Sequence, residues 1–308
     1  MTIVVAGSTG LVGSAISRAL TGRGESVIGI NRKVLDLLDR KATFEFITAA
    51  KPDLVIDAAA IVGGIGANNN FPVDFLSKNI QMQSNLMDAA HAANVERFVF
   101  LGSSCIYPRD CAQPIKEEYL MTGPLEQTNS AYAVAKIAGI ELIRSYRKQF
   151  NRKWISLMPT NMYGPNDNFD LESSHVLPAL INRFVTATKN GDRAVTLWGT
   201  GSPKREFLHV DDFAVAVLIA AEKYDKAEHL NVGTGKDLPI SDLASMIARL
   251  SGFIGKIEWD SSKPDGTPRK VLDVTRIKNL GWEPKISLEL GISSTIEWVN
   301  RNSMGRGR

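Results

Sequence analysis

The segment Ile3-Val-Val-Ala-Gly-Ser-Thr-Gly-Leu-Val-Gly13 joins an apolar run to a helical pattern through three evenly spaced glycines. Gly7 permits a tight turn, Gly10 lets the backbone approach a pyrophosphate, and Gly13 allows a helix to pack closely on a strand. The free N–H groups and the dipole at the start of that helix favour phosphate. A glycine-rich turn without a ligand is the alternative, but the strand before it and the helix after it disfavour that interpretation. The stretch therefore predicts a dinucleotide site formed by Gly7, Ser8, Thr9, Gly10, Leu11, Val12 and Gly13.

Apolar runs that predict strands alternate with amphipathic patterns that predict helices. We expect strands at 26–30, 53–57, 97–101 and 154–158, and helices at 79–93 and 132–150. Such alternation is typical of an α/β protein with a doubly wound parallel sheet of the Rossmann type, which binds ligands at the carboxyl ends of its strands.

After Gly164 the alternation of strand and helix patterns becomes less regular, and segments with glycine and proline predict several loops. We expect a cofactor-binding Rossmann domain at 1–160 and a smaller, mainly substrate-binding portion at 161–308. Within that portion, the segment at about 206–224 is expected to return to the Rossmann domain.

The strand at 26–30 ends in a turn that bears on the choice of cofactor. An enzyme selective for NAD would place an acidic residue here to hold the ribose hydroxyls. The turn instead offers Asn31, Arg32 and Lys33, and an arginine grips a 2′-phosphate through its two parallel N–H groups. These residues predict NADP, with Asn31 and Arg32 as contacts, although the nearby Asp36 leaves NAD open. Further cofactor contacts are expected where two other strands end, at Leu101, Gly102, Pro159, Thr160, Asn161 and Met162.

A serine and a Tyr-x-x-x-Lys pair predict hydride-transfer chemistry. Ser103 follows the strand at 97–101, and Tyr132 and Lys136 come about one helix later. Residues four apart lie on one helical face, so the lysine charge can lower the pKa of the tyrosine. The serine hydroxyl can hold the same substrate oxygen from the other side. The spacing alone often marks an ordinary surface pair, but downstream of a nucleotide fingerprint it favours a catalytic set.

Composition restricts the possible partners and compartments. The chain of 308 residues has a formal net charge of +3, without the bulk basic signal of a nucleic-acid-binding protein. Its apolar stretches are strand-sized, and its start reads as a strand instead of a signal peptide, so we expect no membrane association. Cys105 and Cys111 show no CxxC or Cys/His spacing, which argues against a disulfide framework or a metal site. A cytoplasmic location fits these features.

Several longer sequence motifs resemble those of the GDP-L-fucose synthases, bifunctional epimerase/reductases of the extended short-chain dehydrogenase family. The motifs Ser-Ser-Cys and Ser-His-Val-Leu-Pro are more specific for this family than the motifs of the fold. This chain departs from the family at Ser8-Thr9, where many bacterial members have a sequence similar to His-Arg. The difference puts a phosphate contact in question. The similar segments span nearly the whole chain and lie at 101–108, 132–139, 158–165, 174–180, 205–212 and 263–270.

The resemblance implies the substrate GDP-4-keto-6-deoxy-D-mannose, NADPH as reductant and two reactions in one pocket. A base and an acid would invert C3 and C5 through an enolate, and the family pattern assigns Cys105 as base and His175 as acid. The resemblance also implies that Tyr132 protonates the C4 oxygen, that Lys136 tunes it, that Ser103 orients the carbonyl, and that Lys136 and His175 also contact the cofactor. From the residues alone, Cys105 could be a small buried hydrophobe and His175 a structural histidine. Residues matching the family's nucleotide and sugar contacts are Arg183, Trp198, Arg205, Asp265 and Lys270.

Two other functions remain open from the sequence. A relative on the same scaffold could act on another GDP-4-keto sugar as an epimerase or a reductase only. A non-catalytic NADP-binding sensor would belong to another class, and it would have no need to keep Tyr132 and Lys136. The resemblance further implies a homodimer that pairs the helices at 79–93 and 132–150 across a two-fold axis.

Overall fold

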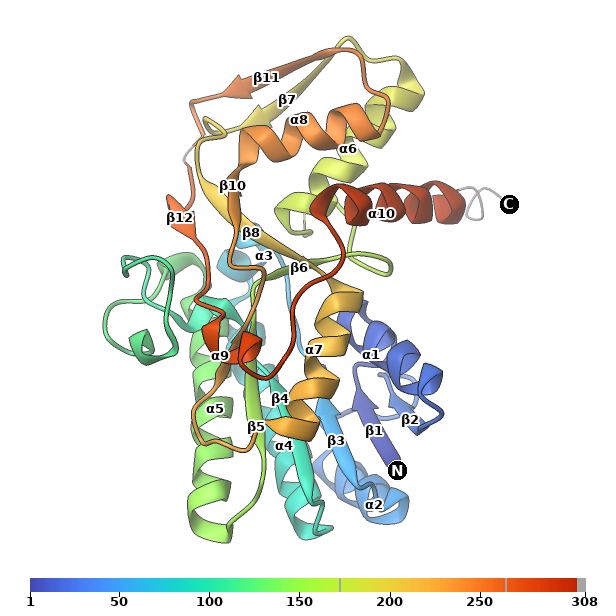
Figure 1. Cartoon of the computed structure of the whole chain (residues 1–308), viewed down its shortest axis with the longest axis vertical. Coiled ribbons are helices and arrows are strands. Elements are labelled where there is room, and N and C mark those ends of the chain that lie inside the picture. Colours follow the sequence, from blue (N-terminus) through green and yellow to red (C-terminus); the bar gives the residue numbers. More distant parts are fainter. Residues whose placement is uncertain (172, 264, 304–308) are drawn as a thin grey trace.

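The computed structural model describes residues 1–171, 173–263 and 265–303. Its main sheet has six parallel strands in the order β2-β1-β3-β4-β5-β9 (Figure 1), which confirms the predicted doubly wound α/β fold. The strands are β1 (Thr2–Ala6), β2 (Ser26–Ile30), β3 (Leu54–Asp57), β4 (Arg97–Leu101), β5 (Ile155–Pro159) and β9 (Leu230–Val232).

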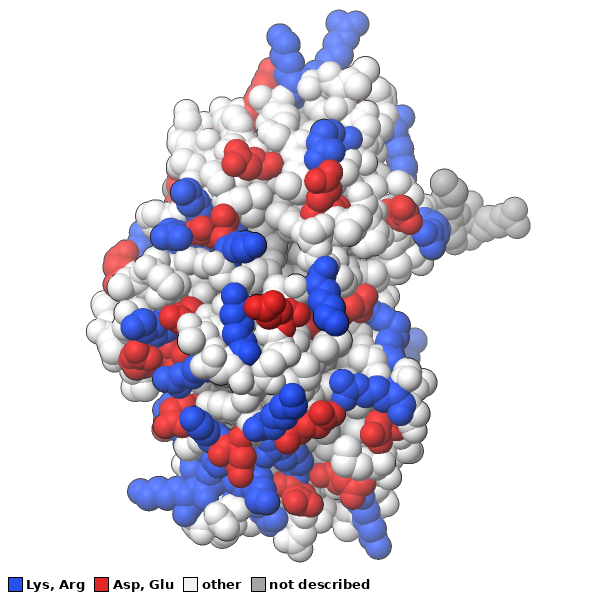
Figure 2. All heavy atoms as spheres, viewed as in Figure 1, with Lys and Arg blue, Asp and Glu red and all other residues white. Residues whose placement is uncertain are grey.

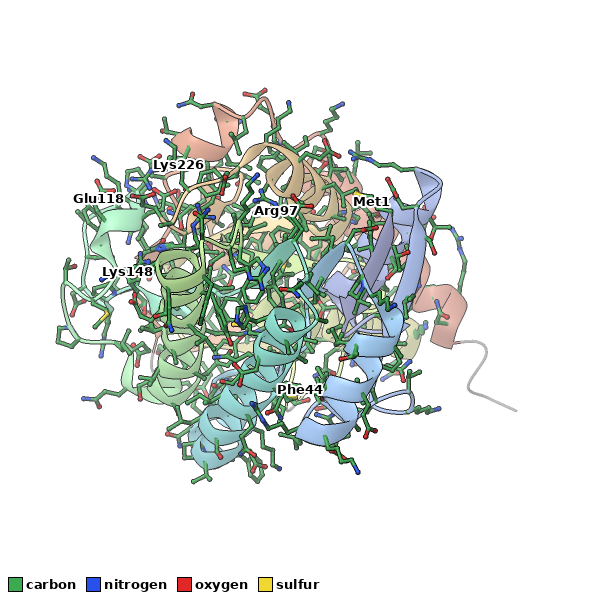
Figure 3. The ribbon with its side chains drawn as sticks, turned by 90° about the horizontal axis from the view of Figure 1, so that it is seen from below. Met1, Phe44, Arg97, Glu118, Lys148 and Lys226 are labelled. Atoms are coloured by element: carbon green, nitrogen blue, oxygen red, sulfur yellow. The ribbon has the colours of Figure 1, made fainter. Side chains whose placement is uncertain are left out.

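Helices cover both faces of this sheet. Seen from below (Figure 3), with the starts of β1 and β4 marked by Met1 and Arg97, one group of helices lies on one face of the sheet and a second group on the other. The first group is α2 (Arg40–Ala50), α4 (Asn79–Ala92) and α5 (Ser130–Phe150), and the second is α1 (Leu11–Gly22) and α7 (Val210–Lys223).

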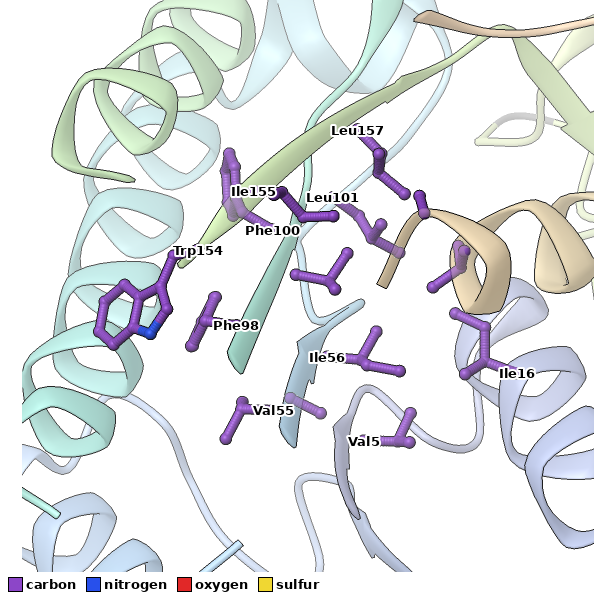
Figure 4. Packing of buried hydrophobic residues seen from close by; sticks show 14 of the residues in the cluster. Val5, Ile16, Val55, Ile56, Phe98, Phe100, Leu101, Trp154, Ile155 and Leu157 are labelled. Atoms are coloured by element: carbon purple, nitrogen blue, oxygen red, sulfur yellow. The ribbon is translucent and has the colours of Figure 1, made fainter. Parts of the chain in front are cut away.

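Because both faces are covered, the strand side chains are apolar on both sides. Val5, Ile56, Phe98, Phe100 and Leu157 are fully buried and pack together between the helices (Figure 4). The helix α5 approaches β4 at Gly139, where an added Cβ would lie 2.3 Å from the ring of Phe100.

A second, smaller core lies beyond the carboxyl ends of the main strands, at the top of Figure 1. It is enclosed by a two-stranded sheet and three helices, and its buried side chains include Phe184, Leu243, Ile247 and Ile292. Its elements are β7 (Ala194–Trp198), β11 (Lys256–Asp260), α6 (Val176–Asn190), α8 (Ile240–Leu250) and α10 (Leu288–Ser303).

The strand β8 (Lys204–His209) connects the two regions. It pairs with β6 (Asn161–Tyr163), β10 (Asp237–Pro239) and β12 (Arg269–Lys270). The following helix α7 packs in the first core, on α1. The short elements are α3 (Ile65–Asn70), α9 (Thr275–Lys278), a π-helical turn at Asp74–Lys78, and 3₁₀ turns at Ser104–Ile106, Glu117–Tyr119 and Gln127–Asn129.

The order of the strands in the main sheet indicates where a ligand-binding crevice lies. Since β2 lies on one side of β1 and β3 on the other, the connections leave the sheet in opposite directions at the carboxyl ends of β1 and β3, where such sheets bind ligands. Basic and acidic side chains are interspersed over the face shown in Figure 2. None of the helices in the described part of the chain combines the length and apolar character needed to span a bilayer.

We expect Gly139→Ala to lower the free energy of unfolding by about 1–3 kcal/mol, because the core around Phe100 has no room for a methyl group. Denaturant unfolding measures this change. The matched control is Gly22→Ala at the end of α1, where an added Cβ meets nothing within 4 Å and the helix gains propensity. Equal stability of the two variants would contradict the packing described for α5 and β4.

Candidate functional site

The glycine loop after β1 is shaped to receive a pyrophosphate. Gly7 has a φ of +75°, and a Cβ on Gly13 would lie 2.1 Å from the carbonyl oxygen of Gly7. The N–H of Gly10 donates to that oxygen at 3.0 Å, which closes the turn. The helix α1 then begins without a side-chain cap and without an acidic residue in its first turn. Its first N–H groups therefore remain available for an anion, and the loop fits the group that the sequence predicts.

The turn after β2 forms the edge of the same crevice. The Oγ of Ser8 donates to the carbonyl of Ile30 at 3.1 Å and so ties the glycine loop to this strand. The Oδ1 of Asn31 accepts the N–H of Lys33 at 2.9 Å, and Arg32 is exposed in the turn that this bond fixes. The carboxylate of Asp36 caps its own turn by accepting the N–H of Leu38 at 3.0 Å. Arg32 is thus available to an anion, while Asp36 is engaged with its own backbone.

The other predicted cofactor residues lie at the ends of β4 and β5. An added Cβ on Gly102 would lie 2.4 Å from the sulfur of Met158, so β4 and β5 approach closely here. The N–H of Thr160 donates to Val232 at 3.0 Å, and the amide of Asn161 donates to the carbonyl of Glu206 at 2.8 Å. The carboxyl edge of the sheet thereby carries Leu101, Gly102, Pro159, Thr160, Asn161 and Met162.

Ser103, Tyr132 and Lys136 meet where β4 ends against α5. The Oγ of Ser103 accepts the N–H of Cys105 at 3.2 Å and caps the 3₁₀ turn. Lys136 is buried, and its Nζ donates to the carbonyl of Leu101 at 2.9 Å. The same Nζ lies 5.9 Å from the ring centroid of Tyr132, so the helix brings the pair together on one face as expected.

The proton affinity of Tyr132 differs from the sequence expectation. Burial, and then the neighbouring Cys105, raise the pKa of this phenol, whereas the sequence predicted that Lys136 lowers it. Burial also lowers the pKa of Lys136 to about 8, and the carboxylate of Asp57 opposes that shift. The spacing of Tyr132 and Lys136 indicated that they share one face of the helix. It did not indicate how strongly burial would desolvate the two side chains. Tyr132 is therefore protonated at neutral pH, as a proton donor must be.

Two polar residues at this site were missed by the sequence analysis. Asp57 ends β3, and burial raises the pKa of its carboxyl to about 6, with Lys136 opposing the shift. The signal in the sequence that could have identified Asp57 is a carboxylate at the end of an apolar strand. Asn129 lies three residues before Tyr132, and its Nδ2 lies 3.5 Å from the Sγ of Cys105. No local pattern distinguishes this asparagine from any other turn residue.

Cys105 and His175 approach the site from different elements. The Sγ of half-buried Cys105 lies 3.9 Å from the Nζ of Lys270, which reaches it from β12. His175 is the residue before α6 and keeps contact with solvent. The surrounding protein and then the charge of Lys270 lower the pKa of His175. One lysine therefore acts on both residues of the predicted acid–base pair.

The predicted substrate residues form a connected group beyond the sheet. Arg205 and Lys270 are register partners on β8 and β12. Arg183 on α6 donates to the carbonyl of Thr196 in β7 at 3.2 Å, and β7 ends at Trp198, which is 69% exposed. A large indole exposed to this extent lies outside both cores.

Asp265 fixes the turn that follows Trp198. Its Oδ1 accepts the N–H of Thr200 at 2.9 Å and its Oδ2 accepts the Thr200 hydroxyl at 2.7 Å. These bonds hold the pKa of the Asp265 carboxyl below its usual value. The Nζ of Lys263 lies 5.8 Å from the ring centroid of Trp198. In this arrangement Asp265 holds the turn that directly follows the indole of Trp198.

Comparison with known proteins agrees with this geometry. A model of the NAD dependent epimerase/dehydratase family matches residues 3–233. GDP-L-fucose synthase 1 of Arabidopsis thaliana is 50% identical over 305 residues, which cover 99% of this chain and 94% of the relative. The GDP-L-fucose synthase of Escherichia coli K12 is 48% identical over 310 residues, or 97% of each chain. The solved structure of a GDP-L-fucose synthetase from Naegleria fowleri bound to NADP has a TM-score of 0.91 at 30% identity, covering 98% of this chain and 95% of that one.

The family model covers the glycine loop, the serine turn and the Tyr-x-x-x-Lys helix. The curated relatives extend the similarity through β12 and the rest of the second core. This chain therefore belongs to the NAD-dependent epimerase/dehydratase family, in the branch of the GDP-L-fucose synthases.

Proposed function

We propose that this protein converts GDP-4-keto-6-deoxy-D-mannose to GDP-L-fucose, by epimerisation at C3 and C5 and then reduction at C4 with NADPH. The observation that carries the proposal is the environment of Cys105. Its sulfur lies beside Tyr132 of the reductase pair and also beside Lys270, whose charge reaches His175. A reductase alone needs Tyr132 and Lys136, whereas a thiol beside Tyr132 and an imidazole within reach of the Lys270 charge supply the extra base and acid of an epimerase.

Epimerisation uses the acidity that the C4 ketone gives to the protons on C3 and C5. Cys105 as a thiolate removes a proton to leave an enolate, and His175 returns a proton on the opposite face, which inverts the carbon. The lowered pKa of His175 makes its protonated form a stronger acid. Asn129 and Lys270 both present N–H donors to the sulfur.

Reduction uses the groups at the start of α5. NADPH supplies the hydride. Tyr132 gives its proton to the C4 oxygen, and its raised pKa keeps the phenol protonated until then. The ammonium of Lys136, 5.9 Å from the ring, stabilises the phenolate that remains. Ser103 holds the carbonyl oxygen in line with Tyr132.

The two nucleotides are held by different parts of the chain. The loop from Gly7 to Gly13 holds the pyrophosphate of NADPH, and Arg32 holds its 2′-phosphate. Arg183 and Arg205 hold the diphosphate of the GDP-sugar, because a guanidinium matches phosphate geometry. Trp198, Asp265 and Lys270 complete the substrate side.

The proposal extends to domains, assembly and location. The two cores support a cofactor domain near 1–160 and a substrate portion near 161–308, with α7, β9 and α9 returned to the first core. A homodimer through α4 and α5 is supported by exposed Val134 and Phe150 on α5. The two unpaired thiols, Cys105 and Cys111, support a cytoplasmic location.

Tyr132→Phe should lower NADPH oxidation with the 4-keto sugar by about 10²–10⁴-fold, because the general acid is lost. Steady-state absorbance measures the rate, and fluorescence titration shows that NADPH still binds. The control is Tyr119→Phe in the 3₁₀ turn Glu117–Tyr119, where the ring is partly buried against the first core, and it should keep wild-type turnover. Wild-type turnover in Tyr132→Phe would refute the reductase assignment.

Arg32→Ala should weaken NADPH binding by about tenfold to a hundredfold and leave NADH binding nearly unchanged, because only NADPH carries the 2′-phosphate. Fluorescence titration with both cofactors measures the two dissociation constants. Lys41→Ala, an exposed cation on α2, serves as control. Equal losses for the two cofactors would mean that Arg32 has only a structural role.

Asp57→Asn should move the alkaline limb of the pH–rate profile to lower pH. Lys136 acts as a cation, its pKa is about 8, and the Asp57 carboxylate raises that value. Without the carboxylate the lysine loses its proton, and the enzyme its activity, at lower pH. Turnover measured from pH 6 to 10 tests this, with the exposed α2 variant Glu45→Gln as control. An unchanged limb would show that Lys136 does not control it.

A further inference from the structure

The sulfur of Cys105 has donors from two distant segments of the chain. The Nδ2 of Asn129 lies 3.5 Å from Sγ, and the Nζ of Lys270 lies 3.9 Å from it on a contact that spans 165 residues of sequence. A thiolate accepts hydrogen bonds from such donors, and an ammonium at this distance also offsets its charge. Tyr132, which also lies beside the sulfur, is neutral at the pH of interest.

Hydrogen bonds hold the backbone that follows Lys270. Lys270 itself lies in β12, in register with Arg205. The N–H of Val271 donates to the side chain of Gln113 at 2.9 Å, and the N–H of Leu272 donates to Glu206 at 2.8 Å. Gln113 belongs to the same connection that follows the Cys105 turn. The lysine and the cysteine are therefore carried by segments that are bonded to each other.

The charge of Lys270 also reaches the second residue of the epimerisation pair. After desolvation by the surrounding protein, it is the next factor that lowers the pKa of His175. A protonated His175 therefore gives up its proton more easily.

We propose that Lys270 is a positioning residue for epimerisation, whose ammonium group holds Cys105 in place as the thiolate base. The inference rests on the proposed function and deepens it, because the sequence resemblance placed Lys270 only among the substrate contacts. A diphosphate contact would act on binding in both half-reactions. A thiolate partner acts on proton removal and leaves hydride transfer to Tyr132 and Lys136.

The test uses Lys270→Met, Lys270→Arg and the control Lys204→Met. Lys204 is exposed on β8, one register position from Arg205 and opposite Arg269 of β12, so the control removes the same charge from the same strand pair. Iodoacetamide alkylation of Cys105 at pH 7, resolved by mass spectrometry, measures the thiolate directly, since only the thiolate reacts. Deuterium exchange from D₂O at C3 and C5 without NADPH measures epimerisation, and NADPH oxidation measures reduction.

Lys270→Met should slow both Cys105 alkylation and deuterium exchange about tenfold or more, while the turnover number for reduction falls much less. Reduction should continue and yield a GDP-6-deoxy-hexose that is not epimerised. Lys270→Arg should restore much of both rates, because it returns a cation to the sulfur, and Lys204→Met should match the wild type. If Lys270→Met fails to fold, Lys270→Gln takes its place in the same comparison.

Unchanged alkylation with a raised KM and equal losses of exchange and reduction would overturn the inference and leave Lys270 as a substrate contact. The failure of the proposed function looks different. A wild-type protein that exchanges no deuterium would refute epimerisation, yet the alkylation rates would still show whether Lys270 supports the thiolate. Exchange at the wild-type rate in Lys270→Met would also overturn the inference.

Discussion

One buried carboxylate joins the main sheet to the segment that carries Lys270. Glu206 is fully buried in β8, where its Oε1 accepts the N–H of Gly235 at 2.6 Å and its Oε2 accepts the N–H of Leu272 at 2.8 Å. Its own carbonyl oxygen accepts the amide of Asn161 at the start of β6, just after β5. Burial raises the pKa of this carboxyl, and the backbone N–H bonds oppose that shift. A buried charge without these bonds would cost several kcal/mol, so the connection forms as a unit.

Burial also sets the proton chemistry of the site, in opposite directions for acids and bases. It raises the pKa of Asp57 to about 6 and lowers that of Lys136 to about 8, so both approach neutrality. The same desolvation keeps the phenol of Tyr132 protonated. The fold thus obtains proton donors and acceptors that work near neutral pH from ordinary residues, because the carboxyl ends of the strands lie deep in the molecule.

Local patterns in the sequence predicted the fold well. The glycine spacing from Gly7 to Gly13 and the apolar runs of the strands report on neighbouring residues, and the parallel sheet confirms them. The shared face of Tyr132 and Lys136 followed from their spacing for the same reason. The raised pKa of Tyr132 could not be predicted, since it depends on how deeply other elements bury the helix. Nor could the contacts of Asn129 and Lys270 with Cys105, which long-range packing brings together.

The pairing of β8 with β12 has a mechanical consequence. Parallel neighbours lie about 4.8 Å apart across a sheet, and Arg205 and Lys270 stand opposite each other in this register. The two cationic residues are therefore held at a fixed spacing by paired strands, and not by independent loops. A tilt of β8 would carry both cations along without changing their spacing, so the pattern of positive charge would keep its shape.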